Sequence, residues 1–155
     1  MDNNAKDFVD EKRKIINDLS SKNIMVLATS AYNMVTARSI SVFVYNDKIY
    51  FQTGNDMEKM EQIQKNNNVA LCCENYQIQG KARNIGNWDN NKDLLPYYLN
   101  KHEGSYKLYG KMKEQIVVEI KIEKVKRWDY INQKPYIGIF DFINHQFSIN
   151  EYLIE

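Results

Sequence analysis

The sequence has few residues of the kinds that build disulfides and metal centres. Its only cysteines, Cys72 and Cys73, are adjacent in an expected strand, where successive side chains point to opposite faces and cannot easily bridge. Its two histidines, His102 and His145, lie far apart, and no spacing of Cys, His and Asp resembles a zinc site. We therefore expect neither a disulfide framework nor a metal, and we interpret the cysteines as small strand residues in a reducing compartment.

An excess of charge of one sign and a long hydrophobic run are also missing. The chain has 21 Lys and Arg against 20 Asp and Glu, a formal net charge of +1, so no one-sided field is available to collect nucleic acid. Residues 1–7 are polar and acidic where a secretory signal would be basic and then apolar, and no later run is long enough to span a bilayer. We expect a cytoplasmic protein whose partners include neither nucleic acid nor a membrane.

Short strands dominate what the sequence does contain. With 155 residues the chain can bury a sizeable core, and we expect a single domain over residues 1–155. Phe8, Ile15, Ile16 and Leu19 share one helical face, which predicts an amphipathic helix over about 5–20. β-Branched and aromatic residues with partial alternation predict six strands, over about 24–30, 35–45, 48–53, 69–74, 77–88 and 116–128.

Turn and cap residues set the first connections. Asn46 and Asp47 suit a two-residue hairpin, because both residues tolerate the positive φ that such a turn needs. Asn55 and Glu58 have the spacing of a capping box, which predicts a helix that begins there. Gly80, inside a strand, predicts a bulge or a close approach of another strand.

Six short strands with few interposed helices favour an antiparallel barrel over a parallel, doubly wound sheet. We expect a mainly β fold in which the barrel covers about 24–130, with flanking helices that include a second one near Pro96. Residues 131–155 carry aromatics without a firm period, and we expect them to form an irregular C-terminal extension with short strands or turns.

One stretch, residues 36–59, combines the groups that bind a phosphate. It places Arg38 on a strand, Thr53 at the end of the next strand and Lys59 in the first turn of a helix. With the free N–H groups of residues 55–57, these supply a planar fork, a hydroxyl, an ammonium and amide donors for a dianion. A second reading stays open, in which Arg38 pairs with an acid on a neighbouring strand and Lys59 is a solvated helix residue.

Three segments, in a fixed order, carry a family resemblance. Residues 38–43 read Arg-Ser-Ile-Ser-Val-Phe, residues 53–71 contain Thr53, Lys59, Ile63 and then Asn-Asn-Val-Ala-Leu, and residues 79–82 read Gln-Gly-Lys-Ala. Together they resemble the first FMN strand, the phosphate-binding segment and the glycine-containing strand of the pyridoxamine 5′-phosphate oxidase-like flavoproteins. The resemblance covers about 24–130 and implies a six-stranded split β-barrel of the FMN-binding type.

The resemblance also implies which residues contact FMN. Arg38 and Lys59 would hold the phosphate, and Gln52 and Thr53 would lie beside the ribityl chain and the phosphate. Four consecutive strand residues would present backbone groups to the isoalloxazine: Ser39, Ile40, Ser41 and Val42.

Two more residues would reach the flavin from farther along the chain. Asn75 is at a position where the family presents an amide from the neighbouring subunit, so the resemblance implies a homodimer with the cofactor between protomers. Trp128 would border the ring, although a strand tryptophan is more often ordinary core.

The chain departs from the family pattern at two places that bear on function. Where the family has a Ser-Arg pair before the lysine, this chain has Met57 and Glu58, which removes two phosphate donors. No arginine follows Arg127, so the basic residues that bind the phosphate of pyridoxamine phosphate are missing and vitamin B6 oxidation is not expected. No catalytic residue is identified, since the sequence offers no triad and no paired carboxylates; the flavin would supply the chemistry.

The resemblance therefore implies an FMN-dependent oxidoreductase that moves hydride or electrons between a reduced donor and a small, flat acceptor. Two alternatives stay open. The protein could bind FMN without catalysis, as a stress-associated protein. The barrel could also hold another cofactor, such as a deazaflavin or haem, or none.

Overall fold

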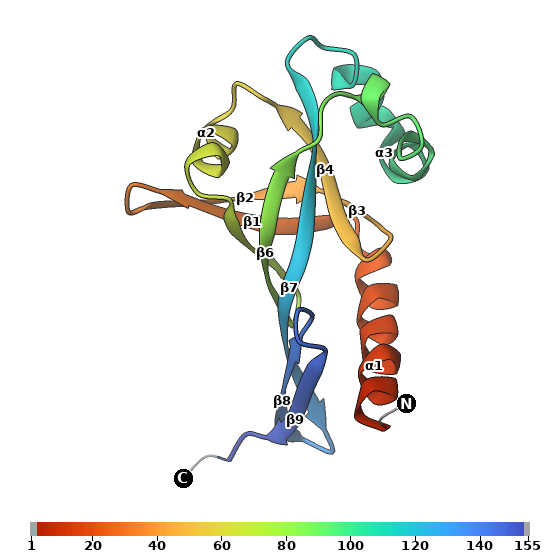
Figure 1. Ribbon diagram of the computed structural model, residues 1–155, viewed down its shortest axis with the longest axis vertical. Coiled ribbons are helices and arrows are strands. Elements are labelled where there is room, and N and C mark those ends of the chain that lie inside the picture. Colours follow the sequence, from red (N-terminus) through yellow and green to blue (C-terminus); the bar gives the residue numbers. More distant parts are fainter. Residues whose placement is uncertain (1–2, 154–155) are drawn as a thin grey trace.

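The computed structural model describes residues 3–153, and these form a mainly β structure (Figure 1). Its helices are α1 (Asn3–Ser20), α2 (Glu58–Lys65), α3 (Leu95–Tyr109) and the 3-10 helix η1 (Trp88–Asn90). Its strands are β1 (Ile24–Ala31), β2 (Met34–Ser41), β3 (Phe43–Tyr45), β4 (Lys48–Gly54), β5 (Asn68–Cys73), β6 (Tyr76–Asn84), β7 (Gln115–Ile131), β8 (Lys134–Asp141) and β9 (Gln146–Glu151). The six predicted barrel strands correspond to β1, β2 with β3, β4, β5, β6 and β7, and every pairing between them is antiparallel.

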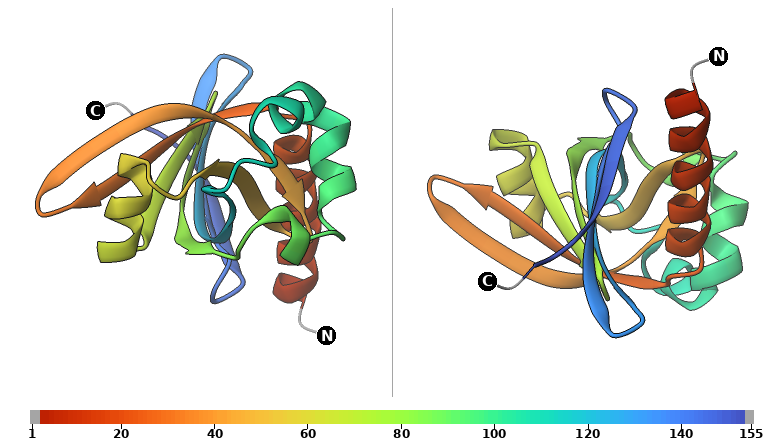
Figure 2. Two further views of the ribbon diagram at one scale, coloured as in Figure 1. Left: turned by 90° about the horizontal axis from the view of Figure 1, so that it is seen from above. Right: turned by 90° about the horizontal axis from the view of Figure 1, so that it is seen from below.

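The sheet closes because one segment of the chain supplies both of its edges. The strand order is β2-β1-β5-β6-β7-β4-β3, and only Val42 separates β2 from β3. The predicted strand over 35–45 is therefore bent at Val42, whose N–H donates to the carbonyl of Asn23 at 2.9 Å. Away from this bend β2 pairs with β1 and β4 pairs with β7, so the barrel is split between β2 and β4, on the side where α2 packs on β1 (Figure 2).

Alternation along the strands fills the barrel with apolar side chains. Leu27, Phe51 and Ile78, from three different strands, are at most 1% exposed. Helix α1 covers one end of the barrel, and the predicted apolar face of this helix is buried, with Phe8 and Ile15 at 2% exposure or less. This packing fixes the inner faces of β2 and β4, where the candidate site lies.

The predicted turn and bulge are both present. Asn46 and Asp47 have φ of 49° and 64°, as the two-residue hairpin requires. The pairing of β6 with β7 shifts register between Gln79 and Gly80. A Cβ at Gly80 would collide with the carbonyl oxygen of Lys121, which explains the need for glycine at this close approach.

The predicted capping box is wrong. Helix α2 begins at Glu58, its N-cap residue is Met57, and no side chain caps it. Asn55 instead lies outside the helix, where its N–H donates to the carbonyl of Glu114 at 2.7 Å. A pairing to the start of β7, rather than a local cap, therefore holds the chain before α2.

Residues 131–155 contain the short strands expected there, β8 and β9, but these strands form a regular hairpin rather than an irregular extension. Strands β8 and β9 form a hairpin on the long strand β7, and these three strands project from the barrel as an arm (Figure 1). A tight turn at Asn132 and Gln133, with φ of 51° and 64°, starts the hairpin, and Phe140 stacks on Phe147 within it.

The predicted helix near Pro96 is α3, and it covers a second, aromatic core made by Phe43, Tyr50, Trp88 and Tyr98. The predicted strand over 77–88 ends early, at Asn84, because Trp88 turns into this core on η1. None of the helices within residues 3–153 combines the length and apolar character that crossing a bilayer requires.

Candidate functional site

Thr53 and Lys59 meet at the split of the barrel. Thr53 lies near the end of β4, where it is 7% exposed, and Lys59 is the second residue of α2 and partly buried. The Nζ atom of Lys59 donates to the Oγ1 atom of Thr53 at 2.9 Å. Because an ammonium can only donate, the Thr53 hydroxyl accepts in this bond and can give its own hydrogen to a further acceptor.

Arg38 enters the site from β2. It lies opposite Leu27 in the β1–β2 ladder, so its side chain points to the inner face of the sheet. Its Nη1 atom donates to Thr29 Oγ1 at 2.7 Å and to the carbonyl of Leu27 at 3.3 Å, and its Nη2 atom donates to Thr36 Oγ1. The guanidinium is therefore held in place from the barrel side.

The two cations are close enough to affect each other. Burial lowers the pKa of Lys59, and the positive charge of Arg38 lowers this pKa further. Burial also lowers the pKa of Arg38, an effect that the charge of Glu58 opposes. Glu58 Oε1 is 3.9 Å from Arg38 Nη2, but its side chain is 68% exposed, so solvent screens this pair. Two adjacent, partly buried cations with one loosely placed carboxylate fit a dianion such as a phosphate monoester.

The alternative reading, in which Arg38 pairs with an acid on a neighbouring strand and Lys59 is solvated, does not agree with the structure. The acid nearest to Arg38 is Glu58 on α2, not a residue of a neighbouring strand. The Lys59 side chain is partly buried and hydrogen-bonded instead of freely solvated.

The remaining strand residues predicted for the cofactor lie outside this group. The Gln52 amide faces α3, since Nε2 donates to the Ser105 carbonyl at 3.1 Å and Oε1 accepts from Trp88 Nε1 at 3.0 Å. The N–H of Val42 donates to Asn23, and its carbonyl accepts from His102 Nε2 at 2.8 Å. Two of their neighbours on β2, Ser39 and Ser41, are accessible, whereas Ile40 is buried in the core.

Asn75 and Trp128 form a second, distant group. The Nδ2 atom of Asn75 donates to the Trp128 carbonyl at 2.7 Å, and the Asn75 carbonyl accepts from the Trp128 N–H at 3.1 Å. Thr53 pairs with Ile116 near the other end of β7. At about 3.3 Å per residue, this places the two groups roughly 40 Å apart along the strand. One protomer therefore does not bring Asn75 and Trp128 to the Arg38–Lys59 site.

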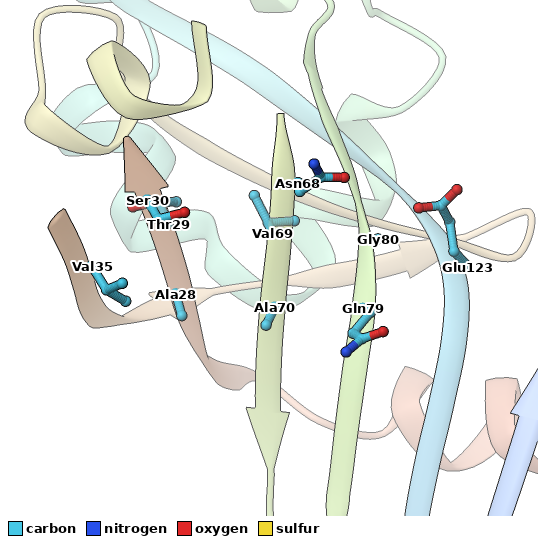
Figure 3. Close-up of a pocket in the computed structure, with 10 residues that line it drawn as sticks. All are labelled: Ala28, Thr29, Ser30, Val35, Asn68, Val69, Ala70, Gln79, Gly80 and Glu123. Carbon is cyan, nitrogen blue, oxygen red and sulfur yellow. The ribbon is translucent and has the colours of Figure 1, made fainter. Parts of the chain in front are cut away.

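A separate groove of about 380 Å³ lies on the outer side of the sheet (Figure 3). Its walls come from β1, β2, β5, β6 and β7, and they include Ala28, Val35, Ala70 and Gln79. None of the ten residues predicted to contact the cofactor lines this groove.

Sequence reasoning missed three polar residues beside Arg38, namely Thr29, Thr36 and Gln62. Thr29 is 2% exposed and Gln62 is 7% exposed, and both contact Thr36. One signal was available: Gln62 lies between the apolar residues Met60 and Ile63, on the inward face of an amphipathic helix, where a glutamine needs a buried partner.

The closed antiparallel sheet, open between β2 and β4, places the chain among the split β-barrels. The family model of pyridoxamine 5′-phosphate oxidase matches residues 9–129, so the chain belongs to this family. No curated protein sequence matches the chain.

Three solved structures with low sequence identity share the fold. A pyridoxamine 5′-phosphate oxidase-related, FMN-binding protein from Nostoc punctiforme is 13% identical with a TM-score of 0.61, over 94% of this chain and 95% of that one. A NimC/NimA family protein from Clostridium acetobutylicum is 17% identical with a TM-score of 0.55, over 92% and 94% of the two chains. A haem-binding protein from Mycobacterium smegmatis is 12% identical with a TM-score of 0.62, over 74% of this chain and 52% of that one.

Proposed function

We propose that this protein is a homodimeric FMN-binding oxidoreductase that passes hydride or electrons from a reduced donor to a small, flat acceptor. The observation that carries the proposal is the pair of adjacent cations, Arg38 and Lys59, at the split of the barrel. The FMN phosphate carries close to two negative charges at neutral pH, and it would relieve the repulsion between these cations. Thr53 would donate its hydroxyl hydrogen to a phosphate oxygen.

FMN suits these donors better than haem does. A haem iron needs an axial ligand, most often a histidine. The Nε2 atom of His102 is hydrogen-bonded to the Val42 carbonyl. The ring of His145 stacks on Phe8 of α1, with the ring centroids 5.3 Å apart, away from the split. FMN binding is also a property of the related Nostoc punctiforme protein. We therefore assign the site to FMN, with haem as an alternative outcome of the experiment below.

A second copy of the chain would complete the cofactor site. Since Asn75 and Trp128 lie roughly 40 Å along β7 from Thr53, they can contact the same flavin only from another protomer. On the outer side of the sheet, strands β1, β2 and β5 offer a face of mostly small residues for this contact. The paired residues on this face are Val26, Ala28, Ala37, Ser39, Ala70 and Cys72. Small side chains allow two sheets to approach closely, so this face supports the homodimer.

The chain supplies binding and orientation, and bound FMN would supply the redox chemistry. Asp89, Glu103 and Asp141 are side chains of the surface: the first two are exposed, and Asp141 caps the turn at Ile143 and Asn144. Vitamin B6 oxidation is not part of the proposal, because no arginine follows Arg127. A flat acceptor such as a quinone or a nitroaromatic compound would stack on the ring.

The test begins with the purified protein, incubated separately with FMN and with haem and then freed of unbound cofactor. We expect a flavin absorption spectrum, a dimer by light scattering, bleaching by NADH or NADPH without oxygen, and recovery on addition of a quinone. A Soret band with no retained flavin would replace FMN by haem. Retained flavin that no nicotinamide reduces would favour a binding protein without catalysis.

A further inference from the structure

A buried polar network lies directly behind Arg38. Gln62, on α2, places its Oε1 atom 2.5 Å from Thr29 Oγ1 and 2.7 Å from Thr36 Oγ1. The two threonines are cross-strand neighbours on β1 and β2, and their hydroxyl oxygens are 3.4 Å apart. Gln62 therefore joins a helix and two strands at one point, on the barrel side of the candidate phosphate site.

The chemistry of the groups sets the direction of the bonds that join the two threonines to Arg38 and to Gln62. Arg38 only donates, so the hydroxyl oxygens of Thr29 and Thr36 must accept from it. Each hydroxyl then has one hydrogen to place, and the Gln62 carbonyl oxygen accepts both hydrogens. The Gln62 Nε2 atom donates to the Met34 carbonyl on β2 at 3.4 Å. Because the acceptor at position 62 takes the hydrogens of both hydroxyls, the lone pairs of both oxygens point toward Arg38.

The network leaves a defined part of Arg38 for a ligand. Contacts to Leu27, Thr29 and Thr36 use three of the five guanidinium N–H groups, counted over the part of the chain that the structure describes. The other two N–H groups stay available to a ligand, and the three bonds fix the orientation of the guanidinium plane that carries them. A fixed fork loses less conformational freedom when it binds a phosphate than a mobile arginine does.

We propose that Gln62 is a positioning residue of the phosphate site: through Thr29 and Thr36 it fixes Arg38 in the orientation that binds the FMN phosphate. The inference rests on the proposed FMN function. It adds a residue that touches no cofactor, and it makes a prediction that a purely structural role for Gln62 does not make. Loss of Gln62 would weaken the binding of phosphate but not the binding of the flavin ring.

The experiment compares FMN with riboflavin, which lacks the phosphate, in Gln62→Met. Methionine keeps the length and volume of the side chain but accepts no hydrogen bond of useful strength. We expect FMN affinity to fall about tenfold, as for one lost bond to a charged group, while riboflavin affinity stays unchanged. Gln64→Met, an exposed position on the same helix, is the matched control and should leave both affinities unchanged.

A second pair of variants covers the case in which Gln62→Met does not fold. Thr36→Val removes one hydroxyl that faces Arg38 and leaves α2 untouched, whereas Thr36→Ser keeps that hydroxyl. The Thr36→Val variant should lose FMN affinity and keep riboflavin affinity, and the Thr36→Ser variant should bind FMN as the wild type does.

The outcomes separate the two proposals. Wild-type protein that binds FMN and riboflavin equally well would overturn the phosphate site and, with it, the role of Gln62. Wild-type protein that prefers FMN, with variants that keep this preference, would overturn only the role of Gln62. An equal loss of both ligands in Gln62→Met and Thr36→Val would assign the network to general stability and overturn the positioning role.

Discussion

Lys59 Nζ donates a hydrogen bond to Thr53 Oγ1 at 2.9 Å, which joins the start of α2 to the end of β4. The bond brings a buried hydroxyl and a partly buried ammonium to the same point, beside the guanidinium of Arg38. Because Thr53 accepts from Lys59, its hydroxyl hydrogen is available to an anion. This relationship gives the site three donors from three elements, and each donor can be tested separately.

Replacing Thr53 by valine tests the hydroxyl. Valine has nearly the same shape, so the barrel should fold, but a donor to the phosphate is lost. A hydrogen bond to a charged group contributes about 1.5–3 kcal/mol, which corresponds to a loss of FMN affinity of about 10-fold to 150-fold. Fluorescence titration measures the affinity, and Thr53→Ser, which keeps the hydroxyl, should stay near wild type. Equal affinities for the valine variant and the wild type would remove Thr53 from the site.

Glu58 should act against the cofactor. Its carboxylate is 3.9 Å from Arg38, where it competes with a phosphate for the same cation. Glu58→Gln should therefore bind FMN a few-fold more tightly, since an exposed ion pair contributes only about 0–1 kcal/mol. Glu61→Gln, at another exposed position of α2, controls for the change in net charge. If Glu58→Gln and Glu61→Gln tightened FMN binding to the same degree, the effect would come from the net charge and not from the position of Glu58.

The lowered pKa of Lys59 predicts how stability and binding depend on pH. Between this lowered pKa and the ordinary value of 10.5, the unfolded chain binds more protons at Lys59 than the folded chain does. The contribution of Lys59 to the free energy of unfolding therefore rises with pH across this window in the absence of ligand. FMN affinity should change in the opposite direction, because the phosphate needs the charged ammonium.

Lys59→Arg is the matched variant for this prediction, since arginine keeps its charge at alkaline pH. Titrations from about pH 7 to about pH 10 should show FMN affinity falling in the wild type and falling less in the variant. Parallel curves for the two proteins would assign the fall to another group, such as the flavin itself.

A glycine substitution in the barrel and one on helix α3 should change stability in opposite directions. Gly80→Ala should destabilise the protein by about 1–3 kcal/mol, because the added Cβ meets the backbone oxygen of Lys121 and lies 3.0 Å from Ile120 Cγ2. Gly104→Ala places its Cβ in open space on α3 and should stabilise the protein by about 0.5–1 kcal/mol. Thermal unfolding measures both changes. A neutral Gly80→Ala would mean that the β6–β7 bulge can relax.

Local patterns were sufficient to predict the barrel. The alternation in β5 and β6 and the Asn46-Asp47 turn are signals that neighbouring residues carry by themselves, and the structure has strands and a hairpin at these places. The sequence also predicted Arg38, Thr53 and Lys59 as one group, and the structure brings these three together.

Features that depend on long-range contacts could not be predicted in this way. The turn from β7 into β8, at Asn132 and Gln133, contains no glycine, and the β8–β9 hairpin that follows is stabilised by the pairing of β8 with β7. The direction of the Gln52 amide could not be predicted either, because its partners, Trp88 on η1 and Ser105 on α3, come from distant parts of the chain. The partners of Gln62 come from β1 and β2, which only the closed barrel brings beside α2.

The most direct test of the account is the ratio of FMN affinity to riboflavin affinity in the wild type and in Lys59→Met. The account predicts that the wild type binds FMN far more tightly than riboflavin. It predicts that Lys59→Met loses most of this preference while its riboflavin affinity stays the same. A Lys59→Met protein that still prefers FMN as strongly as the wild type would contradict the claim that the split of the barrel holds the phosphate.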